Sequence, residues 1–288
     1  MTIREALAQT SAELKKADIE TSSLDASLLL AHILKVSRTA LIALGTEPLS
    51  EENFFALRAL IQRRLNGECI AYIIGKKEFR GLEFLVNPSV LVPRPDTETL
   101  VETALEINKE QLAWYGDREN FCVLDLCTGS GAVAISLKNE MPLLEVWATD
   151  ISAQALETAK ANAQRLLTDS SIQFFSGDLY DAIPRSQFSL IVSNPPYIPT
   201  DEIKTLAAEV QNEPRIALDG GKDGLEIIAR IIDGAPEYLK RGGTLLLEAE
   251  PRQMENIEIL LAEKGFKDIK LYSDLSGLKR VIGGRYEK

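Results

Sequence analysis

Histidine is almost absent from this chain of 288 residues, and cysteine is scarce. The single histidine, His32, lies in an apolar stretch, so the sequence predicts a packed structural side chain. A catalytic scheme that relies on a histidine base is therefore not expected. The three cysteines, Cys69, Cys122 and Cys127, have no nearby histidine to complete a metal site. We therefore expect no metal, and the scattered, odd number of cysteines fits a reducing cytoplasm.

Basic charge is also in short supply, since the net charge is −11 and the pI is near 4.8. Proteins that grip bare nucleic acid usually carry a basic footprint. We therefore expect no direct nucleic-acid contact, and a small-molecule, neutral or basic protein partner is favoured. No apolar run approaches the roughly 18 residues of a membrane span, and no signal-peptide pattern opens the chain. These absences predict a cytoplasmic protein without membrane contact, and a monomer is the simplest expectation.

The N-terminal quarter carries helical periodicity and no strand pattern. Ser23, Ser37 and Ser50 are each placed to cap a helix, and Gly67 is placed to end the last one. Residues 1–72 are therefore predicted to form a small helical bundle. Residues 73–92 form a linker in which alternating apolar positions around a glycine predict a β-hairpin.

From residue 93 to residue 288 the pattern becomes that of an α/β domain. Strand-like and helix-like segments alternate after residue 121, which predicts a mostly parallel sheet with helices on both faces. The last two strand candidates have no helix between them, so an antiparallel strand is expected at the end. The seven predicted strands are residues 121–126, 144–149, 172–175, 188–192, 244–248, 267–272 and 279–284.

A loop of small residues and two acids follow successive strands. The loop opens a helix, whose free N–H groups and small side chains let a ligand approach. Asp150 ends the next strand, where a carboxylate can bind the hydroxyls of a ribose, and Asp178 is placed to accept from an adenine amine. S-adenosylmethionine fits these acids better than a dinucleotide with a pyrophosphate does. The loop consists of Cys127, Thr128, Gly129, Ser130 and Gly131.

A stiff corner follows the fourth strand. Pro195 and Pro196 forbid helix and remove two backbone donors, and Pro195 favours an extended backbone at Asn194. The corner offers the Asn194 side-chain oxygen, the Pro195 carbonyl and the ring of Tyr197. Two acceptors and a flat ring are suited to hold a planar –NH₂ group and to aim its lone pair. We therefore expect residues 194–197 to bind and polarise an amide or an aromatic amine.

Six segments spread over nearly the whole chain carry a family resemblance: residues 67–75, 78–82, 91–98, 124–131, 194–197 and 213–218. They resemble class I S-adenosylmethionine-dependent methyltransferases and, more narrowly, the release factor glutamine methyltransferases. The Asn-Pro-Pro-Tyr sequence alone is shared with adenine-amine DNA methyltransferases. The Pro-Arg-Pro-Asp-Thr-Glu segment at residues 93–98, combined with a helical N-terminal domain, is more specific.

The resemblance implies a fold, a reaction and a set of site residues. The fold is a Rossmann-like, seven-stranded methyltransferase domain, and the acceptor is the glutamine amide of the Gly-Gly-Gln motif of peptide chain release factors. S-adenosylmethionine would become S-adenosylhomocysteine. Residues 127–131, Asp150, Leu179 and Asn194 would contact the cofactor, and Asn194–Tyr197 the glutamine. Residues 93–97, with Arg94 and Pro95 among them, would help to wall the site, and the helical domain would hold the release factor.

Two departures from the family pattern and three alternatives stay open. Cys127 stands where a glycine is usual, and Glu250 stands where the family often has glycine. One alternative acceptor is a glutamine of a ribosomal protein. Another is an adenine amine of DNA, which the acidic charge and the lack of a recognisable base-flipping domain disfavour. The third is a cofactor-binding scaffold without activity.

Overall fold

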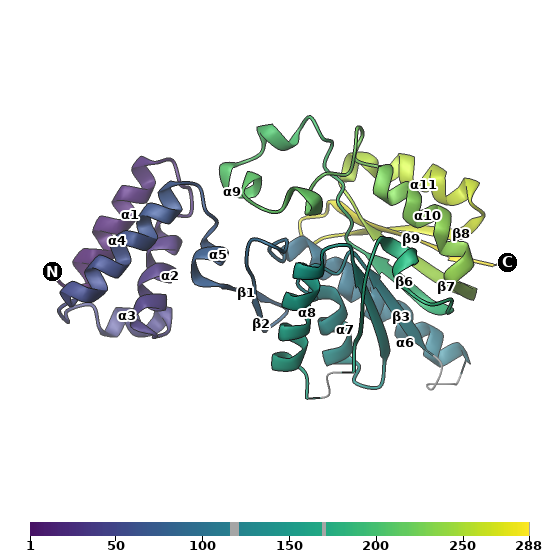
Figure 1. Cartoon of the computed structure of the whole chain (residues 1–288), viewed down its shortest axis with the longest axis horizontal. Helices are drawn as coiled ribbons and strands as arrows, with labels where there is room; N and C mark the ends of the chain where they lie inside the picture. Colours follow the sequence, from purple (N-terminus) through teal and green to yellow (C-terminus); the bar gives the residue numbers. More distant parts are fainter. Residues whose placement is uncertain (116–120, 169–170, 288) are drawn as a thin grey trace. The chain divides into compact units, whose positions relative to one another are not determined.

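The computed structural model describes residues 1–115, 121–168 and 171–287, and these residues form two compact units (Figure 1). The first unit consists of residues 1–76 together with a short insert, residues 207–212. The second consists of residues 77–206 and 213–288. The chain therefore leaves the second unit after Leu206, contributes six residues to the first and returns at Glu213.

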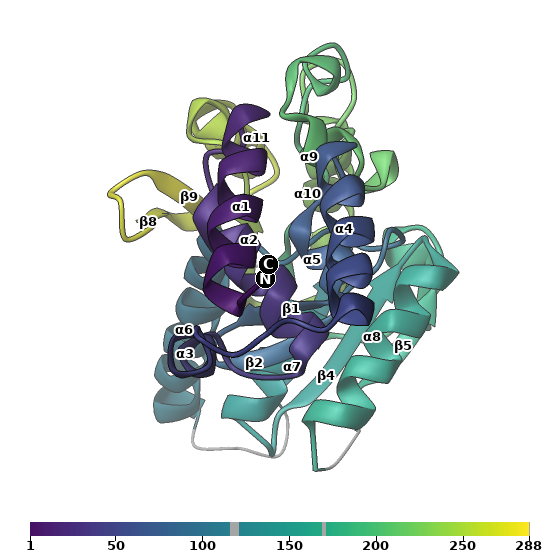
Figure 2. The same ribbon diagram turned by 90° about the vertical axis from the view of Figure 1, so that its left-hand side faces the viewer.

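The first unit is a bundle of helices. It contains α1 (Ile3–Lys16), α2 (Ser22–Leu34), α3 (Arg38–Ala43), α4 (Glu51–Leu65), α5 (Ile70–Ile74) and, in the insert, α9 (Ala208–Gln211). Figure 2 shows α1, α2 and α4 alongside one another. Their facing sides enclose an apolar core that includes Leu14, Leu30 and Ile61. Burial of such side chains at helical spacing is what holds short helices together.

A buried arginine ties the insert to this bundle. Arg64 on α4 is only 6% exposed, and its guanidinium lies 2.7 Å from carboxylate oxygens of both Asp25 and Glu209. The Asn212 side chain also donates to the Gly67 carbonyl at 2.8 Å. A buried cation needs such partners, so residues 207–212 belong to the bundle although the sequence places them far from it.

The helix caps confirm two of the three predicted starts. Ser37 and Ser50 each accept from a backbone N–H of the first turn. Ser23, however, lies inside α2, which starts one residue earlier after Thr21. The expectation for His32 is wrong as well, because this side chain is exposed on α2. Its neighbours Leu29 and Leu30 are buried. The face of α2 that packs in the core is therefore the one that carries these leucines, and His32 lies on another face.

The second unit contains a seven-stranded sheet in the order β5-β4-β3-β6-β7-β9-β8. The five strands from β5 to β7 are parallel, and β9 is antiparallel to both of its neighbours, as the sequence predicts. The strands β3 and β6 are buried at every position, which is typical of parallel strands covered on both faces. The strands are β3 (Cys122–Leu126), β4 (Glu145–Asp150), β5 (Gln173–Ser176), β6 (Phe188–Ser193), β7 (Leu239–Glu248), β8 (Phe266–Ser273) and β9 (Lys279–Tyr286).

Two apolar layers cover the faces of this sheet. One face is packed by α6 (Glu98–Tyr115), α7 (Ala132–Glu140) and α8 (Ala153–Leu166). The other is packed by α10 (Glu226–Tyr238) and α11 (Met254–Glu263), as Figure 1 also shows. This three-layer arrangement is the expected class I methyltransferase fold, and it places the carboxyl ends of the parallel strands at one edge.

The β-hairpin packs with the sheet domain. Its strands, β1 (Lys76–Phe79) and β2 (Leu82–Leu85), form a separate two-stranded sheet. Phe79 and Phe84 are buried in the core of the second unit with their rings 6.1 Å apart. The predicted division at residues 72 and 92 therefore differs from the compact units, because these two rings bring the hairpin into the sheet domain.

Within residues 1–115, 121–168 and 171–287, no helix has the length and hydrophobicity that a membrane crossing requires.

Candidate functional site

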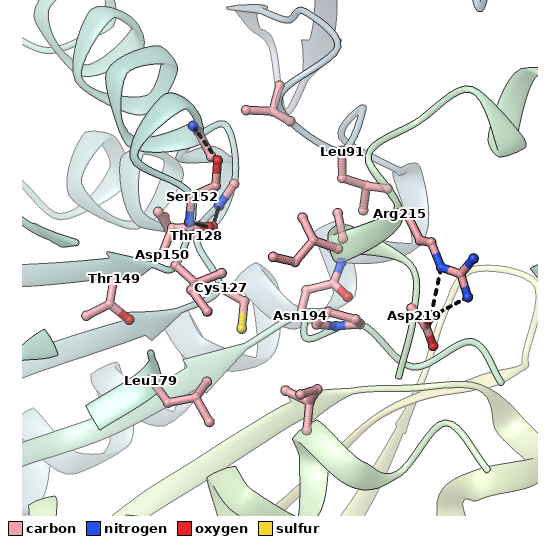
Figure 3. Close-up of a pocket in the computed structure, with 18 of the residues that line it drawn as sticks. Leu91, Cys127, Thr128, Thr149, Asp150, Ser152, Leu179, Asn194, Arg215 and Asp219 are labelled. Carbon is pink, nitrogen blue, oxygen red and sulfur yellow. Dashed lines mark hydrogen bonds and ion pairs between the residues drawn. The ribbon is translucent and has the colours of Figure 1, made fainter. Parts of the chain in front are cut away.

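A pocket of about 930 Å³ lies in the second unit, at the carboxyl ends of β3, β4 and β6 (Figure 3). β3 pairs with β4 on one side and with β6 on the other. Chain connections run in opposite directions from such a point, and open α/β sheets bind ligands there. The volume suits a ligand of nucleoside size. Segments from residue 89 to residue 230 line the pocket, so the fold gathers residues that are far apart in sequence.

The glycine loop, residues 127–131, forms the floor after β3. Cys127, Gly129 and Gly131 all have positive φ, at 60°, 56° and 83°. A Cβ on Gly131 would lie 2.8 Å from Ile135 Cδ1, so only glycine lets α7 start this close to the loop. A Cβ on Gly129 would meet nothing within 4 Å, because this residue faces the open pocket. Four of the five predicted loop residues line the pocket, and Gly131 does not.

Two carboxyl groups, the buried Asp125 and the half-buried Asp150, brace this loop. Asp150 accepts from the Gly129 N–H and from the Ser152 N–H, both at 2.9 Å. Asp125 accepts from the Thr128 hydroxyl at 2.6 Å and from the Ala134 N–H at 3.2 Å. Burial raises the pKa of both groups, to about 7 for Asp125. Both carboxyls are thus held by hydroxyl and backbone donors instead of basic side chains, and both line the pocket.

Asp178 and Leu179 line the pocket next to this loop. The carboxylate of Asp178 is half-exposed and lies 2.7 Å from the guanidinium of Arg230. One oxygen of Asp178 is therefore used by an ion pair that the sequence did not predict. Leu179 has a positive φ of 49° and is buried, so its apolar side chain forms part of the wall.

The corner at residues 194–197 divides between the pocket and the core. Asn194 and Pro196 line the pocket, and Figure 3 shows Asn194 between Cys127 and the Arg215–Asp219 ion pair. Pro195 is buried and Tyr197 packs against the apolar cluster below the sheet, so neither lines the pocket. The Tyr197 carbonyl accepts from the Gln253 amide at 2.9 Å. Burial raises the pKa of the Tyr197 hydroxyl above its usual range.

The segment before α6 supports the other wall. Arg94 lines the pocket and is ion-paired with Glu213, which is buried and also accepts from the Val92 N–H at 3.0 Å. Pro95 starts η1 (Pro95–Thr97), a short 3-10 helix, and lies outside the lining. Thr97 ends that helix and receives a hydrogen bond of 3.0 Å from the Asn194 amide nitrogen.

Sequence reasoning gave no role to three polar residues that this site uses: Asp125, Glu213 and Glu248. Glu248 ends β7 and is buried against Thr97 and Asn194. Each of these residues stands at a strand end or in a segment that the resemblance covers, which was the available signal. In the described part of the chain, no cluster of three or more His, Cys, Asp or Glu side chains is suited to a metal ion.

Comparison with family models finds two matching domains. Residues 5–75 match the PrmC N-terminal domain, and residues 112–219 match the methyltransferase small domain. The first match falls within the helical unit, and the second includes the glycine loop and the Asn194 corner.

Several relatives of known function carry the same name. A release factor glutamine methyltransferase of Bordetella pertussis is 42% identical, with 93% of this chain and 96% of the relative aligned. One from Geobacter sulfurreducens is 39% identical over 99% of this chain and 96% of the relative. One from Coxiella burnetii is 41% identical over 99% of both chains.

Solved structures share the fold at lower identity. A methyltransferase from Pyrococcus furiosus superposes with a TM-score of 0.53 at 19% identity, covering 79% of this chain and 98% of that chain. The catalytic domain of hMettl16 superposes with a TM-score of 0.56 at 14% identity, covering 83% of this chain and 82% of that chain. These likenesses confirm the class I methyltransferase fold.

Proposed function

The chain belongs to the family of release factor glutamine methyltransferases, and on that premise we propose that it methylates the glutamine of the Gly-Gly-Gln motif in a peptide chain release factor. The methyl group would be placed on the side-chain amide nitrogen. The observation that carries the proposal is the position of Asn194, which lies in the same pocket as the glycine loop and Asp150.

The pocket fits S-adenosylmethionine as the methyl donor. Gly129 opens directly onto the pocket, and Asp150 is a carboxylate available to ribose hydroxyls. The carboxyls of Asp125 and Asp150 favour a cationic ligand over a pyrophosphate. When bound, the cofactor supplies an electrophilic methyl group on a sulfonium and leaves as S-adenosylhomocysteine. Residues 127–131, Asp150, Asp178 and Leu179 would hold it.

The Asn194 corner would hold the acceptor. The amide nitrogen of Asn194 is directed to Thr97, which leaves its side-chain oxygen free to accept from a glutamine –NH₂. This oxygen would draw electron density onto a nitrogen that is otherwise a poor nucleophile. The Pro195 carbonyl, which the sequence predicts as a second acceptor, belongs to a buried residue outside the pocket lining. Positioning and polarisation supply the acceleration in such a scheme. The N-methylated amide is formed as a cation that readily loses one proton to solvent, so no histidine base is required before attack. Tyr197 is assigned a supporting role beneath the corner.

The helical unit, residues 1–76 with 207–212, would hold the release factor. An acidic chain of net charge −11 favours a basic partner. The acceptor works on the ribosome, so the reaction would take place in the cytoplasm. We expect the enzyme to act as a monomer.

A transfer assay tests the proposal. The purified protein is incubated with methyl-labelled S-adenosylmethionine and one of four acceptors: a release factor, its Gly-Gly-Ala variant, ribosomal protein, or duplex DNA. We expect label only in the release factor that keeps its Gly-Gly-Gln sequence. Peptide mass mapping should then place the added methyl group on the motif glutamine.

The other outcomes are equally informative. Label in ribosomal protein alone would show that the acceptor is a glutamine of that protein. Label in DNA would show that the Asn194 corner binds the amine of adenine. Label in the Gly-Gly-Ala variant at wild-type level would refute the motif glutamine as acceptor.

A further inference from the structure

The Asn194 side chain can accept a hydrogen bond from the substrate in only one of the two orientations of its amide group. An amide group has an oxygen that accepts and an –NH₂ that donates, at nearly equal positions. If the two were exchanged, the pocket would present a donor to the substrate –NH₂ and the contact would become repulsive. Whatever selects the orientation of Asn194 therefore controls whether the corner is productive.

Two groups behind Asn194 accept hydrogen bonds. The Thr97 hydroxyl oxygen accepts a hydrogen bond of 3.0 Å from the Asn194 amide nitrogen. The Glu248 carboxylate, which is 1% exposed, lies next to both Thr97 and Asn194, and hydrogen bonding from both opposes the rise of its pKa. A carboxylate is an acceptor only, so this side of Asn194 must be the –NH₂ side.

Thr97 is itself held on both sides. Arg94, three residues earlier, is ion-paired with the buried carboxylate of Glu213. Asp96 lies 3.1 Å from the guanidinium of Arg280 on β9, which also pairs with Asp274. The short helix η1 is thus anchored to two separate parts of the domain, which fixes the hydroxyl of Thr97 relative to the end of β6.

We propose that Thr97 and Glu248 are positioning residues that hold the Asn194 amide nitrogen away from the pocket, so that its oxygen faces the acceptor nitrogen. This inference rests on the proposed glutamine methylation and names what orients its central residue. Neither Thr97 nor Glu248 reacts. The Thr97 hydroxyl donates to the Glu248 carboxylate, so its oxygen is left to accept a hydrogen bond from Asn194. Glu248 therefore favours the Asn194 orientation in which the amide nitrogen faces Thr97.

A dependence on pH follows from the burial of Glu248. Burial and, to a smaller extent, the charge of Asp96 raise its pKa to about 7, against the opposing effects of Arg280 and of the hydrogen bonds from Thr97 and Asn194. The hydroxyl of Tyr197 also faces it. One carboxylate oxygen, Oε2, has no hydrogen-bond partner among the described residues. Protonation of Glu248 turns an acceptor into a donor, so kcat should fall as the pH drops below about 7.

The test compares Thr97→Val, which removes the hydroxyl at nearly constant shape, with Thr97→Ser, which keeps it. At saturating S-adenosylmethionine and release factor, we expect kcat of Thr97→Val to fall about 10- to 100-fold. Thr97→Ser should recover most of the rate, and the cofactor KM should change little in either. Glu248→Gln should lower kcat and remove the acid limb of its pH profile. Thr103→Val is the matched control, since Thr103 is buried on α6 outside the pocket lining.

A second measurement does not depend on activity. The Asn194 side-chain –NH₂ signals, assigned by their loss in Asn194→Ala, should exchange with solvent at least tenfold faster in Thr97→Val than in the wild type. Equal exchange would overturn the proposal even if the wild type methylated no release factor. If Thr97→Val kept wild-type kcat while Asn194→Ala was inactive, the positioning role would fail and the proposed function would stand.

Discussion

The two ends of the pocket are built in different ways. At the glycine loop, the carboxylates of Asp125 and Asp150 are held by partners no more than 21 residues away, and most of these partners are backbone N–H groups. At the Asn194 corner, the contact that orients the side chain joins residues 97 positions apart. One end is thus assembled from neighbouring loops, and the other depends on side chains brought together by the whole sheet.

This difference predicts different responses to substitution. Backbone donors stay in place when a side chain changes, so the loop positions that face the pocket should tolerate small replacements, as Cys127 indicates, whereas Gly131 should not. A side-chain contact disappears when either partner is changed, so the Asn194 corner should be sensitive to the loss of single atoms. The following substitutions test this contrast, starting with the largest expected effect.

Asn194→Ala should lower kcat by about 100- to 1,000-fold, because it removes a preorganised acceptor used in the transition state. Cofactor affinity should change little, since the glycine loop is untouched. The measurement is release factor methylation at saturating substrates, together with calorimetric titration of S-adenosylmethionine. Normal turnover by this variant would end the proposed mechanism.

Asp150→Ala should weaken S-adenosylmethionine binding by about 10- to 100-fold, which is the loss of one or two charge-assisted hydrogen bonds. At saturating cofactor, kcat should stay within a few-fold of the wild type. Asp233→Ala is the control, because Asp233 is an exposed carboxylate on α10. A large fall in kcat with unchanged affinity would contradict the assignment of cofactor binding to the glycine loop and of acceptor polarisation to the Asn194 corner.

Asp125→Asn should change how stability depends on pH. The unfolded group has a pKa near 3.9, whereas burial raises the folded pKa to about 7. Between these values the folded chain holds a proton that the unfolded chain has released, so this contribution to stability is lost as the pH rises. The free energy of unfolding of the wild type, relative to the variant, should therefore fall by up to about 1.4 kcal/mol per pH unit.

Urea unfolding of both proteins at pH 5, 6, 7 and 8 measures this difference. Parallel stability curves for the wild type and Asp125→Asn would show that Asp125 titrates normally and that the loop does not bury a protonated acid.

Cys127→Gly should have the smallest effect. Cys127 has a φ of 60°, and a non-glycine residue with this left-handed backbone costs about 1 kcal/mol of folding free energy. Replacing it with glycine removes this cost, but the greater conformational freedom of glycine in the unfolded chain offsets part of the gain. We expect a melting temperature within a few degrees of the wild type and a cofactor Kd within threefold. A tenfold change in Kd would show that the thiol takes part in binding.

The order of elements in the sheet domain could be predicted because each strand carries its own local signal. Alternating apolar segments, the small residues before α7 and the acid at Asp150 are all readable within short windows. The bundle was predictable for the same reason, although the exposed face of His32 was not. Burial of a helical face depends on which neighbours it meets, and the α2 sequence is apolar around most of its circumference.

The insert at residues 207–212 was beyond sequence reasoning. It lies within a long segment of short helices, and its membership in the bundle depends on Arg64 meeting Glu209 across more than 140 positions of the chain. The placement of Tyr197 and Pro195 also came only from the structure, since adjacent residues of one motif turned to opposite sides.

The amino-acid sequence alone determined the class of fold, the loop that faces the ligand and the proline-stiffened turn, because each follows from the conformational limits of a few consecutive residues. Tertiary structure alone decided which way the Asn194 amide points. That choice depends on a threonine from one connection and a glutamate from another strand, which become neighbours only after the sheet has formed.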